Sequence, residues 1–272
     1  MASIELVKNF FGLIKMPFSK AIGVKELFQG QSFKEATSRL QIALENEDVA
    51  LLTGPVGSGK TNVLRYFANQ LDPQAYKVIY IAADEFSLGE IAKRALAALQ
   101  VQVPFQSSPA IRTLQQTISQ LNHEKNIQPV LIIDEIQELP IPTLASLKSL
   151  LNYHMDSQNL LFLLLCGQNT IIENLALIRL EALERRIRVR HALRALSLEE
   201  TASYITDQMN NCGVKQAVFT DDTKAGIFHH SKGIISTINA LCFQLLIYAA
   251  AQSKHIIELS MLELILSQTH IS

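Results

Sequence analysis

The chain has 272 residues, of which 48% are hydrophobic and 18% are charged, and its formal net charge is −1. This composition excludes a disordered chain, and the charge excludes a strong positive field that would attract nucleic acid or a membrane surface. At about 150 residues per domain, the length corresponds to one large domain or to a medium domain with a small one.

Three cysteines, Cys166, Cys212 and Cys242, are scattered along the chain without metal-ligand spacing. Together with the missing secretion signal at the N-terminus, they indicate a reducing compartment. The longest apolar stretches, Leu160–Cys166 and Leu241–Ala251, are well short of the ~20 residues that span a bilayer. We therefore expect a cytoplasmic protein with no membrane contact.

The first 45 residues mix apolar side chains with glycine and proline. Phe10–Leu13 and Met16–Phe18 are typical of an irregular arm that packs against another part of the protein. Gln31–Glu45 then has apolar residues at helical spacing and predicts a helix.

Short apolar runs alternate with helical periods from Val49 to Leu193. Strands are predicted at Val49–Thr53, Val78–Ile81, Val130–Ile133, Leu160–Cys166 and Ile187–Leu193. Helices are predicted at Leu88–Leu99, at Pro109–His123 with Ser108 as its cap, and at Leu144–Leu151. Continuous apolar strands that alternate with helices are typical of a parallel sheet with helices on both faces.

Only helices are predicted after Leu193. A capping box at Ser197–Glu200 begins the first, Thr220 begins the second, and two more follow at Thr237–Ala251 and Glu258–Ser267. The expected organisation is an N-terminal arm with the first helix (residues 1–45), an αβα core (46–194) and a small all-helical domain (195–272).

A glycine-rich loop follows the first predicted strand and precedes a helix. It fits the pattern G-x-x-x-x-G-K-[ST] with Gly54-Pro55-Val56-Gly57-Ser58-Gly59-Lys60-Thr61. In such a loop, backbone N–H groups and the helix N-terminus bind phosphate, the lysine neutralises the β- and γ-phosphates, and the threonine hydroxyl is a ligand of Mg²⁺. The alternative is a glycine turn without a ligand, but the strand and helix on either side favour phosphate binding.

An acidic pair, Asp134-Glu135, follows the predicted strand Val130–Ile133. Taken alone, such a pair usually marks the start of a loop, but the upstream P-loop favours a catalytic role. Asp134 is then expected to hold Mg²⁺ through its water shell, and Glu135 to act as the general base that activates the attacking water.

Two further groups have competing interpretations. Gln168, in preference to Asn169, could orient the water or contact the γ-phosphate, although an ordinary polar strand end explains it equally well. A cluster of arginines precedes the helical region: Arg179, Arg185, Arg186, Arg188, Arg190 and Arg194. One of them could stabilise the phosphoryl group in a neighbouring subunit. Alternatively, the arginines form a solvated basic face, or they form salt bridges to Glu181 and Glu184.

These motifs resemble the AAA+ ATPases, in particular the branch that contains general secretion pathway protein A and the transposition regulators TnsC and TniB. Besides the P-loop, the resemblance is carried by Phe11-Gly12-Leu13, Pro17-Phe18, Gln128–Glu135, Leu150-Leu151-Asn152 with Asp156-Ser157, Gly167-Gln168 and Arg186-Ile187. It implies an α/β fold, a P-loop NTPase with a three-layer αβα core, sheet order 5-1-4-3-2 and an all-helical lid, with ATP or ADP and Mg²⁺ bound between core and lid.

The resemblance also implies a homo-oligomer, either a ring or a helical filament, in which Arg186 completes the site of a neighbour and Arg185 is the alternative. One stretch departs from the family pattern. The lid usually carries Gly-x-Pro-Arg, whose arginine ("sensor 2") reaches the nucleotide, whereas Gly233-Ile234-Ile235-Ser236 has Ser236 at that position. We expect weakened coupling between nucleotide and lid and slow hydrolysis, with Lys232 as a candidate substitute.

Three functions compete. The first is an ATPase that assembles on double-stranded DNA and presents target sites to a transposase, favoured by a chain that ends at Ser272, directly after the lid. The second is a general secretion pathway protein A-like assembly ATPase, which would require the sequence to be a fragment, because that protein continues into a membrane segment and a cell-wall-binding domain. The third is an ATP-dependent scaffold with very slow hydrolysis, favoured by Ser236 and opposed by Glu135.

Contact with DNA would depend on a few local cations. Lys93 and Arg94 lie on the helix predicted after the second strand, and Lys148 on the helix after the third. Each is explained individually as an exposed side chain of an amphipathic helix. Repeated around an oligomer, they would bind phosphates in a salt-dependent way and with little base specificity.

Overall fold

A computed structural model describes residues 4–19, 22–46, 49–153 and 159–269. By its internal contacts the chain divides into two compact units. One unit comprises Gln31–Pro55 and Lys60–Leu193, and the other comprises Met1–Gly30, Val56–Gly59 and Arg194–Ser272. We call them the sheet unit and the helical unit.

The sheet unit contains five parallel strands in the order β2-β3-β4-β1-β5. The strands are β1 (Val49–Thr53), β2 (Tyr76–Ala82), β3 (Gln128–Asp134), β4 (Phe162–Gly167) and β5 (Ile187–Ala192). This order confirms the prediction 5-1-4-3-2. Every residue of β1 and β4 is buried, as expected for uninterrupted apolar runs in a parallel sheet with both faces covered.

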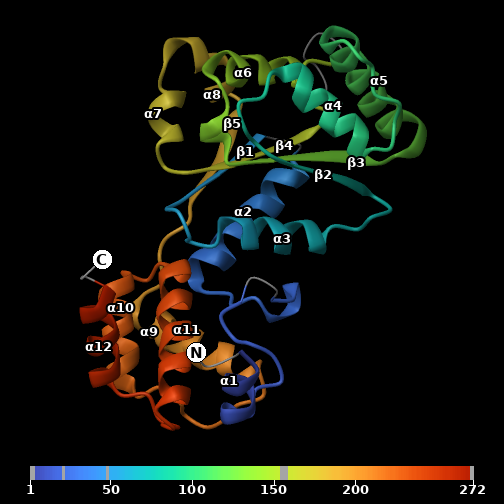
Figure 1. The fold of residues 1–272 in the computed structure, drawn as a ribbon. Helices are drawn as coiled ribbons and strands as arrows, with labels where there is room; N and C mark the ends of the chain where they lie inside the picture. Colours follow the sequence, from blue (N-terminus) through green and yellow to red (C-terminus); the bar gives the residue numbers. More distant parts are fainter. Residues whose placement is uncertain (1–3, 20–21, 47–48, 154–158, 270–272) are drawn as a thin grey trace. The chain divides into compact units, whose positions relative to one another are not determined.

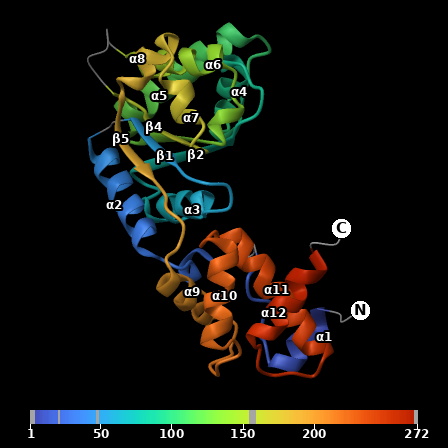
Figure 2. The same ribbon diagram turned by 90° about the vertical axis from the view of Figure 1, so that its left-hand side faces the viewer.

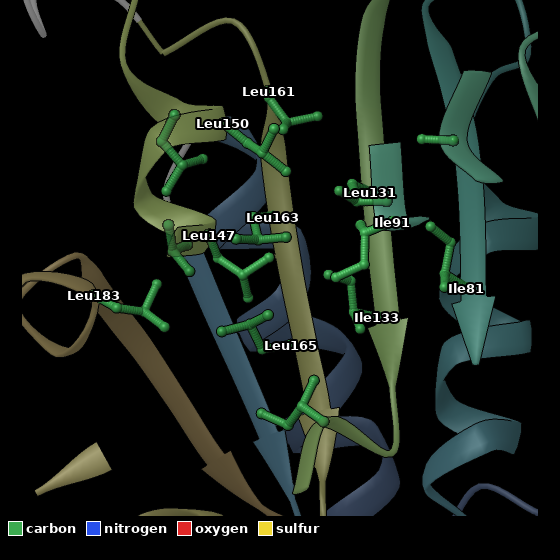
Figure 3. Close-up of a cluster of buried hydrophobic side chains, with 14 of the residues drawn as sticks. Ile81, Ile91, Leu131, Ile133, Leu147, Leu150, Leu161, Leu163, Leu165 and Leu183 are labelled. Atoms are coloured by element: carbon green, nitrogen blue, oxygen red, sulfur yellow. The ribbon is translucent and has the colours of Figure 1, made fainter. Parts of the chain in front are cut away.

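Helices cover both faces of the sheet (Figures 1 and 2). On one face lie α2 (Gln31–Glu45) and α3 (Lys60–Gln70). The other face carries α4 (Leu88–Ala98), α5 (Ser107–Lys125), α6 (Ile141–Ser146), η3 (Leu147–Leu151) and α8 (Glu181–Glu184). Figure 3 shows the buried layer beneath this second group, where Leu163 and Leu165 of β4 lie between Leu131 of β3 and Leu147 of η3. The layer is apolar, so its burial stabilises the sheet.

Two helix predictions need correction. Helix α5 begins at Ser107, after Gln106, which makes no side-chain capping bond, so Ser108 is not the cap. A β-carbon on Gly89 would lie 2.3 Å from that of Ser107, so this turn packs closely against α4. The predicted helix Leu144–Leu151 is instead α6, which begins at Ile141 after Pro140, followed by the 3₁₀ helix η3.

The helical unit contains α9 (Leu198–Asn210), α10 (Asp221–Ser231), α11 (Ile235–Ala251) and α12 (Leu259–Thr269). The N-terminal segment belongs to it and is not simply irregular, because α1 (Ile4–Phe11) is a helix and η1 (Val24–Glu26) a 3₁₀ turn. Val7, Phe11 and Phe18 are buried in the same apolar cluster as the lid helices. By contrast α2 packs with the sheet, where the Phe33 and Tyr66 rings meet edge to face. The chain therefore divides near Gly30, which differs from the expected separate segment of residues 1–45.

Asp156 and Ser157, which contribute to the family resemblance, lie outside the described residues. Within the described ranges, we find no helix with both the length and the apolar character needed to cross a membrane.

Candidate active site

The carboxyl ends of the central strands define the candidate site. Thr53 at the end of β1 is in register with Gly167 at the end of β4, and Ala82 of β2 is in register with Asp134 of β3. The P-loop, the acidic pair and Gln168 therefore follow the same edge of the sheet, where open parallel sheets bind ligands.

The P-loop has the backbone that phosphate binding requires. Gly57 and Gly59 have φ of +75° and +97°, a left-handed region that side chains other than glycine rarely adopt. Helix α3 begins directly afterwards at Lys60. The Lys60 side chain is only 5% exposed, and its Nζ donates to the carbonyls of Gly54 and Pro55 at 3.1 Å each. An ammonium group has three N–H donors, so one is left for a phosphate oxygen.

Val56–Gly59 group with the helical unit, and within it they meet the start of α11. The Ser236 backbone N–H donates to the Gly57 carbonyl at 3.1 Å. A β-carbon at Gly57 would lie 1.9 Å from the Ser236 Oγ, so the two backbones are in close contact. At the position of the expected sensor-2 arginine, the chain thus has a short side chain packed against the loop. Weakened coupling to nucleotide remains a prediction.

Asp134 is a buried carboxylate, 2% exposed, surrounded by donors. Its Oδ2 accepts hydrogen bonds from the Thr61 hydroxyl at 3.0 Å and the Tyr80 hydroxyl at 3.1 Å, and its Oδ1 accepts from the Glu135 N–H at 2.9 Å. Hydroxyl and carboxylate oxygens are ligands that Mg²⁺ prefers. The two residues predicted to hold the metal, Thr61 and Asp134, are therefore adjacent, and their chemistry fits Mg²⁺.

Tyr80 was not singled out by the sequence patterns. It lies on β2, two residues before Ala82, on the face that carries Asp134 on β3. Burial, followed by the negative charge of Asp134, raises the pKa of Tyr80 well above its usual value, so the hydroxyl remains a donor. The available signal was a tyrosine two residues before the end of a strand whose neighbour ends in aspartate. Cys166 also faces Asp134, and burial raises the pKa of its thiol.

Glu135 has a left-handed backbone, with φ of 55° and ψ of 41°, and its side chain is half-buried. Its Oε2 accepts a hydrogen bond from Gln137 Nε2 at 2.6 Å. The same Gln137 side chain accepts a hydrogen bond from the Gln168 backbone N–H, at 2.9 Å from its Oε1. The structure thus brings Glu135 and Gln168 together through Gln137, a residue that the sequence patterns did not indicate.

The two candidate trans-acting arginines contact side chains of the sheet unit. Arg185 forms an exposed ion pair with Glu181 one helical turn earlier, as in the alternative interpretation of the arginine cluster. Arg186 donates from a terminal guanidinium nitrogen to the Asn152 Oδ1 at 2.8 Å. The role of either arginine in a neighbouring site remains a prediction.

The candidate DNA-binding cations also have intramolecular contacts. The Arg94 guanidinium lies 4.0 Å from the centre of the Phe86 ring. Lys93 donates to the Phe105 carbonyl and lies 5.7 Å from the centre of that ring. Lys148 is exposed on η3. DNA binding by these residues remains a prediction.

Comparison with known proteins agrees with this geometry. Residues 43–175 match the family model of the AAA domain. The chain is 31% identical over 253 residues to general secretion pathway protein A of Aeromonas hydrophila, an alignment that covers 91% of this chain and 45% of that protein. The chain thus spans somewhat less than half the length of this relative.

Solved structures show the same fold at low sequence identity. The ORC2 protein of Aeropyrum pernix, in ADPNP and ADP complexes, superposes with a TM-score of 0.68 at 18% identity, covering 93% of this chain and 71% of that one. The ORC1 protein of the same organism, in complex with DNA, gives a TM-score of 0.66 at 17% identity, covering 97% and 68%. At this identity the likeness supports the fold alone, that of a P-loop AAA+ ATPase.

Proposed function

The chain is an AAA+ protein similar to general secretion pathway protein A, and from this premise we propose that it binds ATP and hydrolyses it to ADP and phosphate in an Mg²⁺-dependent reaction. One observation carries the proposal. The Thr61 hydroxyl at the start of α3 lies 3.0 Å from the buried carboxylate of Asp134 at the end of β3. This is the pair that P-loop NTPases use to hold Mg²⁺, and it lies beside Lys60 and the acidic Glu135.

Each residue of the site has its own role in the proposed ATP hydrolysis. The P-loop N–H groups and the remaining Lys60 donor bind the phosphates, and Thr61 and Asp134 would hold Mg²⁺. Mg²⁺ held by these two residues would supply positive charge that offsets the negative charge of the phosphates. Glu135 accepts a proton from the water that attacks the γ-phosphorus, so that the bond to the β,γ-bridging oxygen breaks and ADP leaves.

Among the biological roles, similarity favours an assembly ATPase of the general secretion pathway protein A type. The 31% identity extends over 91% of the chain, beyond the AAA domain itself. No comparable similarity supports the regulation of transposition with a transposase partner. The presence of Glu135, a candidate general base, argues against a scaffold that does not hydrolyse ATP. DNA binding is proposed only as a property to test, since the A. pernix ORC1 structure contains DNA.

Substitutions of Lys60 and Glu135 test the proposal. We expect Lys60→Ala to abolish binding of a fluorescent ATP analogue, because it removes the charge that faces the phosphates. We expect Glu135→Gln to bind the analogue normally while phosphate release falls by roughly 100-fold or more, because the water loses its general base. Lys125→Ala and Glu124→Gln, exposed on α5, are matched controls that should retain wild-type values.

The outcomes separate the candidates. Normal nucleotide affinity in folded Lys60→Ala would contradict the P-loop assignment, and unchanged phosphate release in Glu135→Gln would show that Glu135 is not the base. Tight ATP binding by the wild type without phosphate release would favour the scaffold. If double-stranded DNA stimulates phosphate release and electron microscopy shows rings or filaments, the transposition role would be favoured instead.

A further inference from the structure

The side-chain amide of Gln137 connects Glu135 to the end of β4. Its Nε2 lies 2.6 Å from Glu135 Oε2, and its Oε1 lies 2.9 Å from the Gln168 backbone nitrogen. The orientation of this amide follows from its partners. A backbone N–H can only donate and an ionised carboxylate can only accept, so the Gln137 oxygen must face Gln168 and its NH₂ group must face Glu135.

Gly167 leaves the space that this connection needs. A β-carbon on Gly167 would lie 2.7 Å from Gln137 Oε1 and 2.8 Å from Ile136 Cγ1, closer than non-bonded atoms approach. Gly167 is the last residue of β4 and is buried. The glycine of the Gly167-Gln168 pair therefore lets the Gln137 carbonyl reach the backbone of the next residue.

In the turn that follows β3, the side-chain donor to the Glu135 carboxylate is the Gln137 amide. The left-handed backbone of Glu135 directs the chain into the short 3₁₀ helix η2 (Ile136–Glu138), whose Gln137 turns back toward it. The second N–H of the same amide lies 3.2 Å from Glu138 Oε1. A hydrogen bond to an ionised acceptor is about twice as strong as one between neutral groups, so the Gln137 donor restricts where the Glu135 carboxylate lies.

We infer that Gln137 is a positioning residue: its amide holds Glu135 for proton abstraction and makes that position depend on the backbone at the end of β4. The inference rests on the proposed ATP hydrolysis with Glu135 as base. The remaining oxygen, Oε1, is the one left to accept the proton of the attacking water. Movement of the Gly167-Gln168 backbone would displace the carboxylate through a single side chain.

Two near-isosteric variants test the inference. Gln137→Met removes both hydrogen bonds, whereas Gln137→Glu keeps an oxygen for the Gln168 N–H and loses the donor to Glu135. We expect both to lower kcat for ATP by roughly 10- to 100-fold, the loss typical of a displaced catalytic group. KM and the affinity for a fluorescent ATP analogue should stay within about twofold, because no phosphate contact changes. Gln116→Glu, an exposed glutamine on α5, is the control and should retain wild-type kcat.

A double substitution shows whether the effect passes through Glu135. In the Glu135→Gln background, adding Gln137→Met should change the residual rate less than about twofold, because the group that it positions is absent. A wild-type kcat in Gln137→Glu, a kcat that rises, or a full additional loss in the double variant would each overturn the inference. If Gln137→Met does not fold, Gln137→Glu decides. Wild-type protein without ATPase activity would instead refute the proposed function.

Discussion

Asp134, a proposed Mg²⁺ ligand, accepts three hydrogen bonds. Thr61, Tyr80 and the Glu135 N–H all contact it, and it is buried at the end of β3. Thr61 is the expected metal partner, and the Glu135 N–H is part of the local backbone. Tyr80 is the additional group, and its hydroxyl orients the carboxylate from the neighbouring strand. Such supporting donors commonly affect metal affinity.

Tyr80→Phe should therefore weaken Mg²⁺ dependence without unfolding the protein. The substitution removes one hydroxyl from a half-exposed ring, and we expect the Mg²⁺ concentration that gives half-maximal phosphate release to rise roughly tenfold. Because burial and Asp134 raise the pKa of Tyr80, its hydroxyl keeps its proton up to about pH 9, and the difference should be the same at about pH 7 and pH 9. Tyr76→Phe on the same strand is the control, and an unchanged Mg²⁺ response would contradict the role.

Gln137 illustrates what sequence reasoning misses at this scale. Lys60, Thr61, Asp134 and Glu135 are found from spacing, because each follows a strand or begins a helix at a fixed offset. Gln137 acts through a bond to the backbone of Gln168, 31 residues away. A local sequence pattern cannot reveal this bond, because the bond forms only when β3 and β4 lie next to each other in the sheet.

At the level of elements, apolar periodicity and capping residues are local signals that locate helices. The predicted limits of α2, Gln31–Glu45, match the structure, and α9 begins after the predicted cap Ser197. The Ser197 hydroxyl accepts from the Glu200 N–H at 3.1 Å, and Glu200 accepts from the Ser197 N–H at 2.9 Å. The errors fall where tertiary packing overrides such signals, as at the start of α5 against Gly89.

Ser197→Ala measures the contribution of this cap. It removes the acceptor of an N-terminal N–H of α9, and we expect the free energy of unfolding to fall by about 1 kcal/mol in urea denaturation. Thr206→Ala is the control on the same helix, where the hydroxyl only bonds back to the Ala202 carbonyl in mid-helix. Equal effects of the two substitutions would argue against a capping contribution.

At the scale of the whole molecule, the boundary between the two units falls within the P-loop. Val56–Gly59 group with the helical unit, whereas Lys60 and Thr61 belong to the sheet unit. Within the helical unit, the Ser236 backbone N–H donates a hydrogen bond to the Gly57 carbonyl. Because a serine side chain is uncharged, Ser236 cannot make the charged contact to the phosphates that a sensor-2 arginine would make.

Arg186 provides the test of assembly. If it completes the site of a neighbouring subunit, Arg186→Ala should leave nucleotide binding intact and remove the part of the ATPase rate that rises with protein concentration. Arg185→Ala examines the alternative, and Arg112→Ala on α5 serves as the exposed control. A specific activity that does not depend on concentration, and that Arg186→Ala leaves unchanged, would exclude a shared site.

The sequence by itself determined the parallel sheet, the P-loop and the acidic pair, because apolar periodicity and glycine spacing are local properties of the chain. Resemblance to the AAA+ ATPases supplied the strand order, which the structure confirms. Only the tertiary structure decided that residues 1–30 pack with the lid helices, that Tyr80 supports Asp134, and that Gln137 joins Glu135 to β4. These contacts join residues far apart in the chain, and their geometry exists only once the strands are in register.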